Sequence, residues 1–442
     1  METLVLTNTQ KQSPESVFAP LADRPGSVWL DSSMHFSDRG RSSFIAEDPQ
    51  FDVMLENDRV LVRAPNRSLQ TLPGDQIWDL LTQLWNSREY FSVGYISYEA
   101  TLPFLGVASR HQRCDIPSVR FLFYDTVRKF EHSCGEDALG QADHDNHHDL
   151  TKQGEDSFSS VDPVGDWHHT IEREDYLDRV RTIKDHIREG DIYQANFTTR
   201  IDVSNTEPPF EVYRKLRRLN PAPYSAYMNF GDYQVLSSSP ERMFAKRGRR
   251  LSTSPIKGTI ARGNDRSQSA RNRRRLLESE KDRAELLMIV DLERNDLGRI
   301  ARPGSVSVDH LFKTETYSSV IHLVSNISAE LASEVSTTDV ISAMLPGGSI
   351  TGAPKKRAVE IINELEVCPR SVYTGCIGYV HGDDADFNIA IRTMTYADSV
   401  YRIHAGGGIV ADSDPEGEYR EMLLKAHNLL QAVGVQMESA AC

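Results

Sequence analysis

Short runs in which apolar and polar residues alternate predict β-strands in the first third of the chain. They cover FDVML (residues 51–55), RVLV (59–62) and FSVGYI (91–96), and such alternation is typical of strands with one buried face. Further runs occur later, and two neighbouring pairs are joined by short turns at Gly231-Asp232 and at residues 396–398. Short connections favour antiparallel pairing. The later strands are predicted at residues 225–230, 233–236, 243–245, 372–380, 388–394 and 400–404.

A helical period of apolar residues follows residue 170. Tyr176, Val180, Ile183 and Ile187 fall on one face, and Gly190 supplies the stop. A strand is predicted directly afterwards, at residues 191–201. Three more helices are predicted at residues 278–292, 354–365 and 415–433, and the last two begin with a proline near the first helical position.

The stretch from residue 134 to residue 169 is rich in Asp, Gly, Ser and His and poor in aliphatic residues, which is typical of a long exposed connection. We therefore interpret its histidines as solvated groups rather than metal ligands (His144, His147 and His148). A chain of 442 residues is long for a single core. We divide it into an N-terminal region (residues 1–132), a polar linker (133–169) and a C-terminal region (170–436).

Composition narrows the class of protein. Hydrophobic residues make up 39% and charged residues 26% of the chain, as in ordinary globular proteins, and the net charge of −14 argues against a nucleic-acid partner. The one dense basic run, Arg271 to Arg275, is interpreted as a solvated helix start. No secretory signal and no membrane-spanning apolar run is evident. The cysteines show no zinc-like spacing, so we predict a reduced, cytoplasmic protein without a membrane partner (Cys114, Cys134, Cys368, Cys376 and Cys442).

Lys257 is the first candidate for chemistry. It lies in SPIKGT (residues 254–259), a segment of small residues between two strand-like runs. An exposed lysine is mostly protonated at neutral pH, but burial or a nearby cation lowers its pKa and makes it a nucleophile. Ile256 supplies an apolar neighbour, and Gly258 lets a substrate approach the backbone. Most lysines on turns are solvated, so this interpretation depends on the rest of the chain.

Two predicted helices present carboxylates beside a basic residue. Glu285 follows Lys281 by one turn and precedes the apolar run LLMIV, so it stands where its helix enters the interior. In the last helix, Glu418, Glu421 and Lys425 share one face. Surface ion pairs are one interpretation. The other is a Mg²⁺ site with one carboxylate from each helix, because Mg²⁺ takes oxygen ligands and keeps positions for water or substrate.

Two glycine-rich segments are candidate anion-binding sites. PGGSITGAPK (residues 346–355) runs into a predicted helix, whose free N–H groups suit a carboxylate or phosphate. AGGGIV (residues 405–410) follows a predicted strand and leaves room for a ligand beside the main chain. Neither matches the P-loop, and a tight turn is the alternative for each. Arg392 alternates with apolar neighbours on a predicted strand, where a buried arginine would need a bidentate acidic partner. Together these features suit a small substrate with two carboxylates and a leaving oxygen.

In their order along the chain, these segments resemble those of the chorismate-utilising enzymes. The resemblance runs from about residue 176 to residue 430, and RSSFI (residues 41–45) is similar to a strand in the weaker N-terminal part of that family. It implies an α+β fold with two large, mostly antiparallel sheets facing each other and helices outside. The matching motifs are DIYQ (191–194), SPER (239–242), PIKGT (255–259), IVDLERNDL (289–297), HLVS (322–325), GGSITGAPK (347–355), GCIGY (375–379) and GGGIV (406–410).

Within that family, Lys257 resembles the aminodeoxychorismate synthases, component I, whereas anthranilate synthases look like PIAGT at this place. Direct addition of ammonia at C2 of chorismate needs no enzyme amine. Placing nitrogen at C4 with retained geometry favours two displacements, the first by lysine. Isochorismate and salicylate synthases look to carry a lysine base where this chain has Gln194. A glutamine cannot activate water, so hydroxyl transfer is disfavoured.

The resemblance also implies the remaining roles. Glu241 is similar to the general acid for the departing hydroxyl, and His322 to a histidine beside the ring, although a satisfied core histidine is its alternative. Glu285 and Glu421 resemble the Mg²⁺ ligands. The groups that hold the substrate carboxylates would be Gly258, Thr259, Tyr373, Arg392, Gly406, Gly408 and Lys425.

Ser43, Pro223, Tyr224 and Ser225 resemble a tryptophan-binding pocket, which could be inhibitory, structural or empty. The chain contains no recognisable glutamine-hydrolysing segment, so a separate glutamine amidotransferase subunit is expected to supply ammonia. We predict 4-amino-4-deoxychorismate synthesis for p-aminobenzoate and folate formation. The alternatives are an anthranilate synthase with an unusual lysine, or a non-catalytic subunit that senses chorismate or an amino acid.

Overall fold

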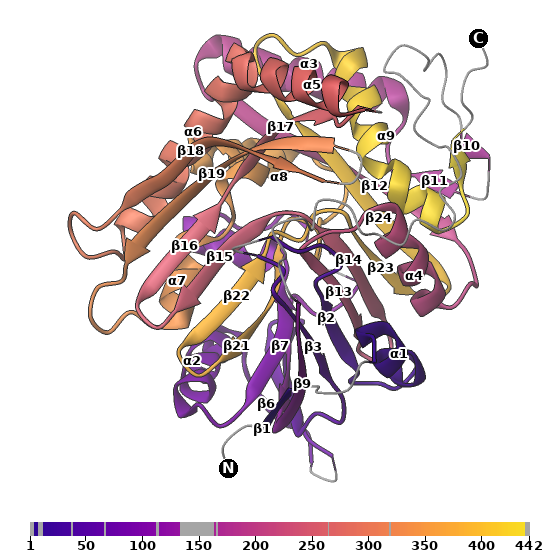
Figure 1. Ribbon diagram of the computed structural model, residues 1–442, viewed down its shortest axis with the longest axis vertical. Helices are drawn as coiled ribbons and strands as arrows, with labels where there is room; N and C mark the ends of the chain where they lie inside the picture. The colour runs from indigo at the N-terminus through magenta and orange to yellow at the C-terminus, as the bar shows by residue number, and fades with distance from the viewer. Residues whose placement is uncertain are drawn as a thin grey trace.

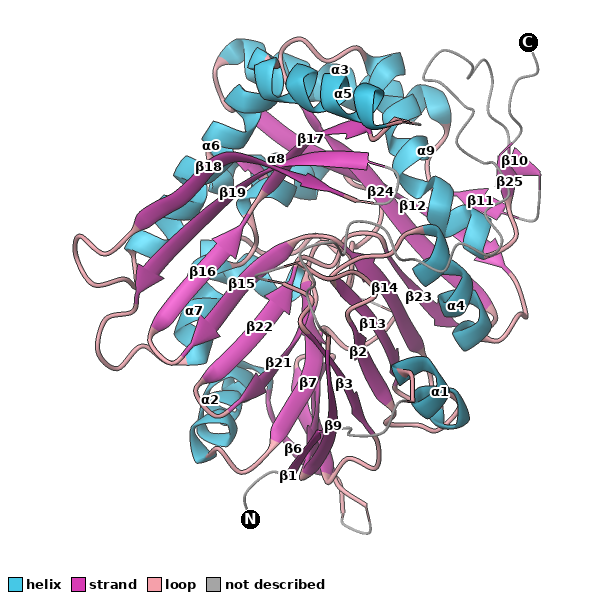
Figure 2. Cartoon of the chain, in the orientation of Figure 1, coloured by secondary structure: helices cyan, strands magenta, loops and turns pink. Residues whose placement is uncertain are grey.

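Two large β-sheets form the body of the protein in the computed structural model, and they face each other with helices on their outer sides (Figure 1, Figure 2). The structure describes residues 4–7, 12–36, 39–65, 68–111, 115–132, 163–164, 167–263, 265–317 and 320–437. Most of the predicted linker, including His144, His147 and His148, lies outside these residues, as do Cys114, Cys134 and Cys442. Cys368 and Cys376 are free thiols.

The first sheet has eleven strands in the described part of the chain, and nearly all of its pairings are antiparallel. The exception is β1, which runs parallel to β9. Both short turns noted in the sequence connect antiparallel neighbours here, β13 with β14 and β23 with β24. In order, the strands are β1 (Leu4–Thr7), β9 (Thr126–Glu131), β3 (Ser42–Ala46), β2 (Val28–Asp31), β13 (Tyr224–Asn229), β14 (Gln234–Ser239), β23 (Thr393–Ala397), β24 (Val400–Ile409), β12 (Gln194–Ser204) and β11 (Trp167–His169), with β20 (Gly352–Ala353) beside β12.

The second sheet has twelve described strands and is antiparallel throughout. Both sheets combine strands from the N-terminal and C-terminal regions of the chain. The order is β17 (Ile256–Ala261), β19 (Val320–Glu330), β16 (Arg250–Ser254), β15 (Arg242–Arg247), β22 (Asp384–Asn388), β21 (Cys376–His381), β7 (Phe91–Ile96), β8 (Val119–Tyr124), β4 (Phe51–Glu56), β5 (Arg59–Arg63) and β6 (Gln70–Pro73), with β18 (Ser307–Thr316) beside β19.

Alternation along the strands divides the interior into three apolar layers. On β13, Tyr227 packs toward the helices outside the first sheet, whereas Met228 packs between the sheets. On β8, Phe121 packs on the outer side of the second sheet and Leu122 packs between the sheets. Successive side chains of a strand point to opposite faces, so each sheet buries both of its faces. This arrangement confirms the predicted fold class.

The helices cover the outer faces, and several gather near β17 and β12 (Figure 1). Among the described residues, no helix is long and apolar enough to cross a membrane. A short pairing of β10 (Pro163–Val164) with β25 (Gln436–Met437) lies outside the sheets. The helices are α1 (Pro14–Phe18), α2 (Ile77–Ser87), α3 (Arg173–Glu189), α4 (Pro209–Leu219), α5 (Arg266–Glu278), α6 (Glu280–Gly298), α7 (Thr337–Met344), α8 (Lys355–Leu365) and α9 (Pro415–Ala432), with 3-10 turns at Ala19–Leu21, Gly74–Gln76, Glu99–Leu105 and Gly348–Ile350.

Several predicted boundaries were wrong, each for a local reason. The helix expected at residues 278–292 is α6, which begins at Glu280 and continues to Gly298, while residue 278 ends α5. Ser279 separates the two helices, because it leaves the helical conformation and caps α6 by accepting a hydrogen bond from the N–H of Asp282. The basic run therefore lies within α5. The strand expected at residues 372–380 begins only at Cys376, after a turn in which Ser371 and Thr374 have positive φ. The strand expected at residues 191–201 begins at Gln194.

Candidate active site

Lys257 lies on β17, where Gly258 interrupts the pairing with β19. Lys257 pairs with Leu323 and Thr259 with His322, so Gly258 is the extra residue of a β-bulge. Its φ is 71°, and a Cβ at this position would come within 2.9 Å of Asp282 on α6. Both the backbone conformation and this close contact therefore require glycine. The Lys257 side chain is half-buried, and its Nζ donates a long hydrogen bond of 3.4 Å to the carbonyl oxygen of Ser349.

The surroundings of Lys257 favour its neutral form. Burial lowers the pKa of the Lys257 amine. The Glu285 carboxylate acts in the opposite direction, the Lys425 ammonium lowers the pKa further, and Glu241 and Glu421 raise it. These charges come from α6, from α9 and from the connection between β14 and β15. The structure thus brings four other predicted residues around the Lys257 amine.

Glu241 lies between β14 and β15 and is 3% exposed. Its Oε1 accepts a hydrogen bond of 3.3 Å from the N–H of Ile256. Burial raises the pKa of the Glu241 carboxyl, and the Lys257 charge opposes that shift. Ser349 also lowers the pKa of this carboxyl, against the effect of burial. A carboxyl group with a raised pKa keeps its proton more readily, which is the requirement for a general acid.

The glycine-rich segment GGSITGAPK folds as a 3-10 turn and the short strand β20 before α8 begins at Lys355. The prediction that it runs into a helix is confirmed. Its first helical lysine does not face an open anion site, however, because Lys355 pairs with buried Asp296 on α6. The segment instead contributes Ser349, whose carbonyl oxygen accepts the hydrogen bond from Lys257 and which lowers the pKa of Glu241.

The second glycine segment was predicted to follow a strand, but it forms the end of β24 itself. A Cβ on Gly406 would lie 2.2 Å from the carbonyl oxygen of Phe197, and one on Gly408 would lie 2.8 Å from Nε2 of Gln194. Gly406 therefore requires glycine because the backbone of β12 approaches so closely, whereas a side chain at Gly408 would displace the Gln194 amide. The Lys425 Nζ donates a hydrogen bond of 3.1 Å to the carbonyl oxygen of Gly406.

Gly407 faces the acidic side of α9. A Cβ at this position would lie 3.1 Å from Glu418 Oε2, 3.5 Å from Lys425 Nζ and 3.8 Å from Glu421 Oε1. Glu421 pairs with Lys425 at 2.7 Å, which lowers the pKa of the Glu421 carboxyl. Glu285, on α6, raises the pKa of the Lys257 amine, as Glu421 does. The carboxylates and the space left by glycine fit a hard cation such as Mg²⁺.

His322 lies on β19, half-buried, with its Nδ1 2.9 Å from Oγ1 of Thr259. The Tyr317 ring meets the imidazole edge-on, with 4.8 Å between ring centroids. Burial, helped by the Arg392 charge, lowers the pKa of His322 to about 4. The imidazole is therefore neutral at physiological pH.

Tyr373 and Arg392 lie where the chain crosses between the sheets. Arg392 was expected on a strand, but β22 ends at Asn388 in one sheet and β23 begins at Thr393 in the other. Arg392 has a φ of 51° in this crossover. Among the described residues its guanidinium forms no ion pair, contrary to the expected acidic partner, and burial lowers its pKa. Tyr373 stacks on His404 with ring centroids 5.4 Å apart.

A cavity of about 700 Å³ lies between the sheets, and Pro223, Tyr224 and Ser225 line it. Ser43 is not part of this lining. It is fully buried, and its hydroxyl accepts a hydrogen bond from the N–H of Ser32 and bonds Nε2 of His132. Three of the four predicted pocket residues thus line the cavity. The fourth, Ser43, is hydrogen-bonded to Ser32 and His132, which also line it.

Two buried charged residues were not among the predicted site residues. Arg39 lines the cavity and pairs with Glu315 on β18. Glu293 on α6 is 3% exposed, accepts a hydrogen bond of 2.8 Å from Thr253, and its pKa is raised well above the usual range by burial. Glu293 stood inside a quoted motif, and its position with Asp296 on the face that also carries Ile289, Val290 and Leu297 could have marked it as buried. No local signal marked Arg39.

Comparisons with known proteins agree with this geometry. Residues 30–431 match the family described as chorismate binding enzyme. Aminodeoxychorismate synthase component 1 of Bacillus subtilis (strain 168) is 37% identical over 342 residues, which are 73% of this chain and 72% of that protein. Anthranilate synthase component 1 3 of Haloarcula marismortui is 47% identical over 259 residues, which are 58% of this chain and 52% of that protein.

A solved structure, anthranilate synthase component I from Streptococcus pneumoniae TIGR4, has a TM-score of 0.73 and is 28% identical, covering 96% of this chain and 99% of that one. The two names occur among relatives of similar identity. Aminodeoxychorismate synthase component 1 of Klebsiella aerogenes, for example, is 44% identical over 62% of this chain and 60% of that protein. Similarity alone therefore does not choose between the two activities.

Proposed function

This chain belongs to the chorismate-binding enzyme family, and on that premise we propose that it converts chorismate and ammonia to 4-amino-4-deoxychorismate through a covalent bond to Lys257. The observation that carries the proposal is the pairing of Lys257 with Glu241. The amine has a lowered pKa and the carboxyl a raised pKa, and one backbone segment holds both. An anthranilate synthase has no use for the amine.

In the first displacement, Nζ of Lys257 forms a bond to C2, the ring double bond shifts, and the C4–O bond breaks. Glu241 donates the proton that converts the departing hydroxide to water, and it regains a proton from the new Nζ–carbon ammonium. In the second displacement, ammonia forms the C4–N bond as the C2–Nζ bond breaks. Glu241 protonates the leaving amine and recovers its proton from the C4 ammonium, so the cycle closes.

The substrate carboxylates need cationic partners and backbone donors. Arg392, without an ion pair among the described residues, and Lys425 are the cations proposed for this role, with Tyr373 and Thr259 beside them. Gly258, Gly406 and Gly408 are the backbone positions proposed to contact these carboxylates. His322, neutral and held by Thr259, would lie beside the ring.

Mg²⁺ is the proposed cofactor, with Glu285 and Glu421 as ligands. When bound, the ion would neutralise a ring carboxylate and so favour departure of the hydroxyl group. Without the ion, Lys425 balances the charge of Glu421.

Gln194 supports amino transfer rather than hydroxyl transfer. Its side chain is 1% exposed, and in the described part of the chain neither its Oε1 nor its Nε2 has a hydrogen-bond partner. A glutamine amide does not take up a proton at neutral pH, so it cannot serve as the base that activates water. It can orient a nucleophile that already carries its own lone pair, as ammonia does.

The relatives are named component 1, which implies a partner subunit. We propose that the partner is a glutamine amidotransferase that supplies ammonia, in the formation of p-aminobenzoate and folate. The proposed compartment is the cytoplasm.

A product assay tests the proposal. The purified chain is incubated with chorismate, Mg²⁺ and ammonium, and 4-amino-4-deoxychorismate lyase is then added. Formation of p-aminobenzoate supports the proposal, and formation of anthranilate in its place favours the anthranilate synthase alternative. Chorismate that is bound but not consumed would favour a sensing subunit.

A further inference from the structure

Phe36 and Arg39, which follow β2 in the N-terminal region, contact strands that lie next to the catalytic candidates. The N–H of Phe36 donates a hydrogen bond of 2.8 Å to the carbonyl oxygen of Arg39. The Arg39 guanidinium lies over the Phe36 ring, 5.4 Å from its centroid. Arg39 is 1% exposed although it is a long charged residue.

The Arg39 charge is matched by Glu315 on β18, with which it forms an ion pair. Both side chains are almost fully buried, at 0% and 3% exposure, and 276 residues separate them in the chain. Lys313 is the next cation near Glu315, at 3.9 Å. Breaking a buried pair leaves an uncompensated charge, so the position of Arg39 and that of β18 depend on each other.

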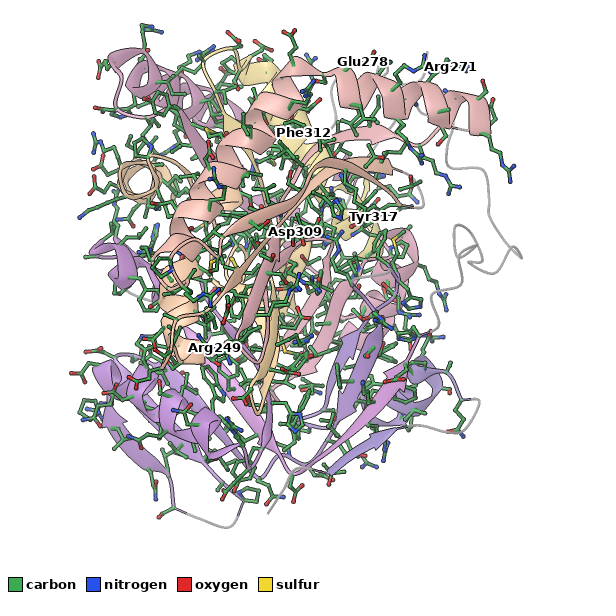
Figure 3. All side chains as sticks on the ribbon, turned by 60° about the vertical axis from the view of Figure 1, so that its left-hand side comes forward. Arg249, Arg271, Glu278, Asp309, Phe312 and Tyr317 are labelled. Carbon is green, nitrogen blue, oxygen red and sulfur yellow. The ribbon has the colours of Figure 1, made fainter. Side chains whose placement is uncertain are left out.

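Glu315 is in register with His322. Across the sheet, Glu315 pairs with His322 and His322 pairs with Thr259, so the ion pair lies one strand away from the candidate histidine. A second path runs through rings, because Phe36 lies 5.2 Å from Tyr317, whose edge meets His322. Figure 3 shows Phe312 on β18 and Tyr317 just after this strand, below the helix that carries Arg271 and Glu278.

We propose that Arg39 is a positioning residue: through Glu315 and through Phe36 and Tyr317 it holds His322 against the ring of the substrate. The inference rests on the proposed function, since it assigns His322 a place beside that ring. Arg39 also lines the cavity between the sheets. Arg39 therefore both lines the cavity and forms an ion pair with β18, the strand beside the one that carries His322.

A matched pair of variants tests this role. Arg39→Met removes the proposed contact, and Arg120→Met removes an equally buried arginine whose partner is Asp52 (7% and 8% exposed), on strands β8 and β4 at the other end of the same sheet. Both leave a buried carboxylate, so both lower the melting temperature. For whichever product the wild type forms, we expect Arg39→Met to lower kcat at least tenfold with KM changed less than threefold, and Arg120→Met to keep kcat within twofold.

Arg39→Lys should regain part of the lost kcat, because it restores the charge without the planar fork. Equal losses of kcat in the two methionine variants, or no loss in Arg39→Met, would overturn the proposal.

A second measurement does not depend on turnover. The protein is labelled with ¹³C-histidine, and the His322 resonance is identified from its absence in His322→Gln. Arg392 and Arg39 are the cations whose charges act on this imidazole, and Thr259 and Tyr317 contact it. Removing Arg39 should raise the pKa of His322 and shift its ring resonances, while Arg120→Met leaves them in place. Unchanged resonances in Arg39→Met would refute the proposal even where the product assay succeeds, and a shift would uphold it even where that assay fails.

Discussion

Glu241 and Lys257 share a support: the N–H of Ile256, one residue before Lys257, donates its hydrogen bond to the Glu241 carboxylate at 3.3 Å. Movement of β17 therefore displaces both groups together. Burial raises the pKa of Glu241 and lowers that of Lys257. The charge of each residue partly reverses the pKa shift of the other. An acid and a nucleophile fixed in this way are suited to act in a single displacement.

Lys257→Ala should abolish amino transfer. We expect kcat to fall at least about 100-fold, because the first displacement loses its nucleophile, while chorismate still binds. Mass spectrometry of the wild-type enzyme during turnover should show an adduct on Lys257. Lys215→Ala, which removes a surface lysine paired with Glu207, is the control and should retain full activity. Near-normal activity in Lys257→Ala, without added amine, would contradict covalent catalysis.

The pH profile should be bell-shaped at a fixed concentration of free ammonia. Activity requires a protonated Glu241 and a neutral Lys257, and the pKa of the first is raised while that of the second is lowered. Rising pH helps the lysine and harms the acid, so kcat/KM passes through a maximum. In Glu241→Gln the falling limb at high pH should disappear, leaving weak activity that rises with pH. A second falling limb in this variant would show that another group is the acid.

Loss of a carboxylate should weaken the response to Mg²⁺. Glu285→Gln and Glu421→Gln are each expected to raise the Mg²⁺ concentration for half-maximal activity at least about tenfold, since each removes a charged oxygen ligand. Mn²⁺ binding followed by electron paramagnetic resonance gives a readout without turnover. Glu416→Gln, at an exposed residue of the same helix that pairs with Arg173, serves as the control. Unaltered metal affinity in both variants would show that the metal binds at another place.

The cavity between the sheets is expected to bind tryptophan. Titration calorimetry should detect the ligand, and Tyr224→Leu should lower its affinity by about fivefold through loss of aromatic packing. Tyr396→Leu changes a tyrosine that packs on Tyr401 on another strand and should leave binding intact. Absence of heat with the wild type, at ligand concentrations in the millimolar range, would show that this cavity serves another molecule.

Acid should destabilise the protein through His404. Burial lowers the pKa of His404 to about 3, well below that of an unfolded histidine. Above the unfolded pKa both states are neutral, so stability is fully present there. As pH falls below about 6.5, only the unfolded state takes up the proton, and unfolding becomes easier by about 1.4 kcal/mol per pH unit. Urea titrations at pH 7.5, 6.5 and 5.5 measure this slope.

His404→Gln should show a shallower slope, because glutamine can keep the 3.1 Å bond from residue 404 to the carbonyl oxygen of Pro369 without titrating. His168→Gln, at an exposed residue, should reproduce the wild-type slope. If the three proteins lose stability in parallel, His404 is not the group responsible.

Much of the fold could be predicted where one local pattern decided the structure. The turn at Gly231 and the cap at Gly190 both lie where the pattern placed them, because a glycine with positive φ terminates an element without help from the rest of the chain. The crossover before Arg392 could not be predicted. Its residues alternate like a strand, and only the two flanking sheets determine that residues 389–392 pass from one to the other.

The candidate site was predictable residue by residue but not as an arrangement. Gly407 was passed over in the list of glycines that contact substrate, yet it is the one that faces Glu418 and Glu421. Its importance depends on α9 lying against β24, which is a tertiary contact. Arg39 was missed for the same reason, because its partner Glu315 belongs to a strand formed almost three hundred residues later.

The chain closes each of its two sheets with strands drawn from both of its ends, β7 and β8 beside β21 in one sheet, and β2 beside β13 in the other. Neither end can complete a hydrophobic layer alone, so no early part of the nascent chain has a finished surface to fold against. Both sheets can therefore be completed only after the C-terminal strands are present, and damage to an N-terminal strand would disturb the same sheet that carries the catalytic candidates.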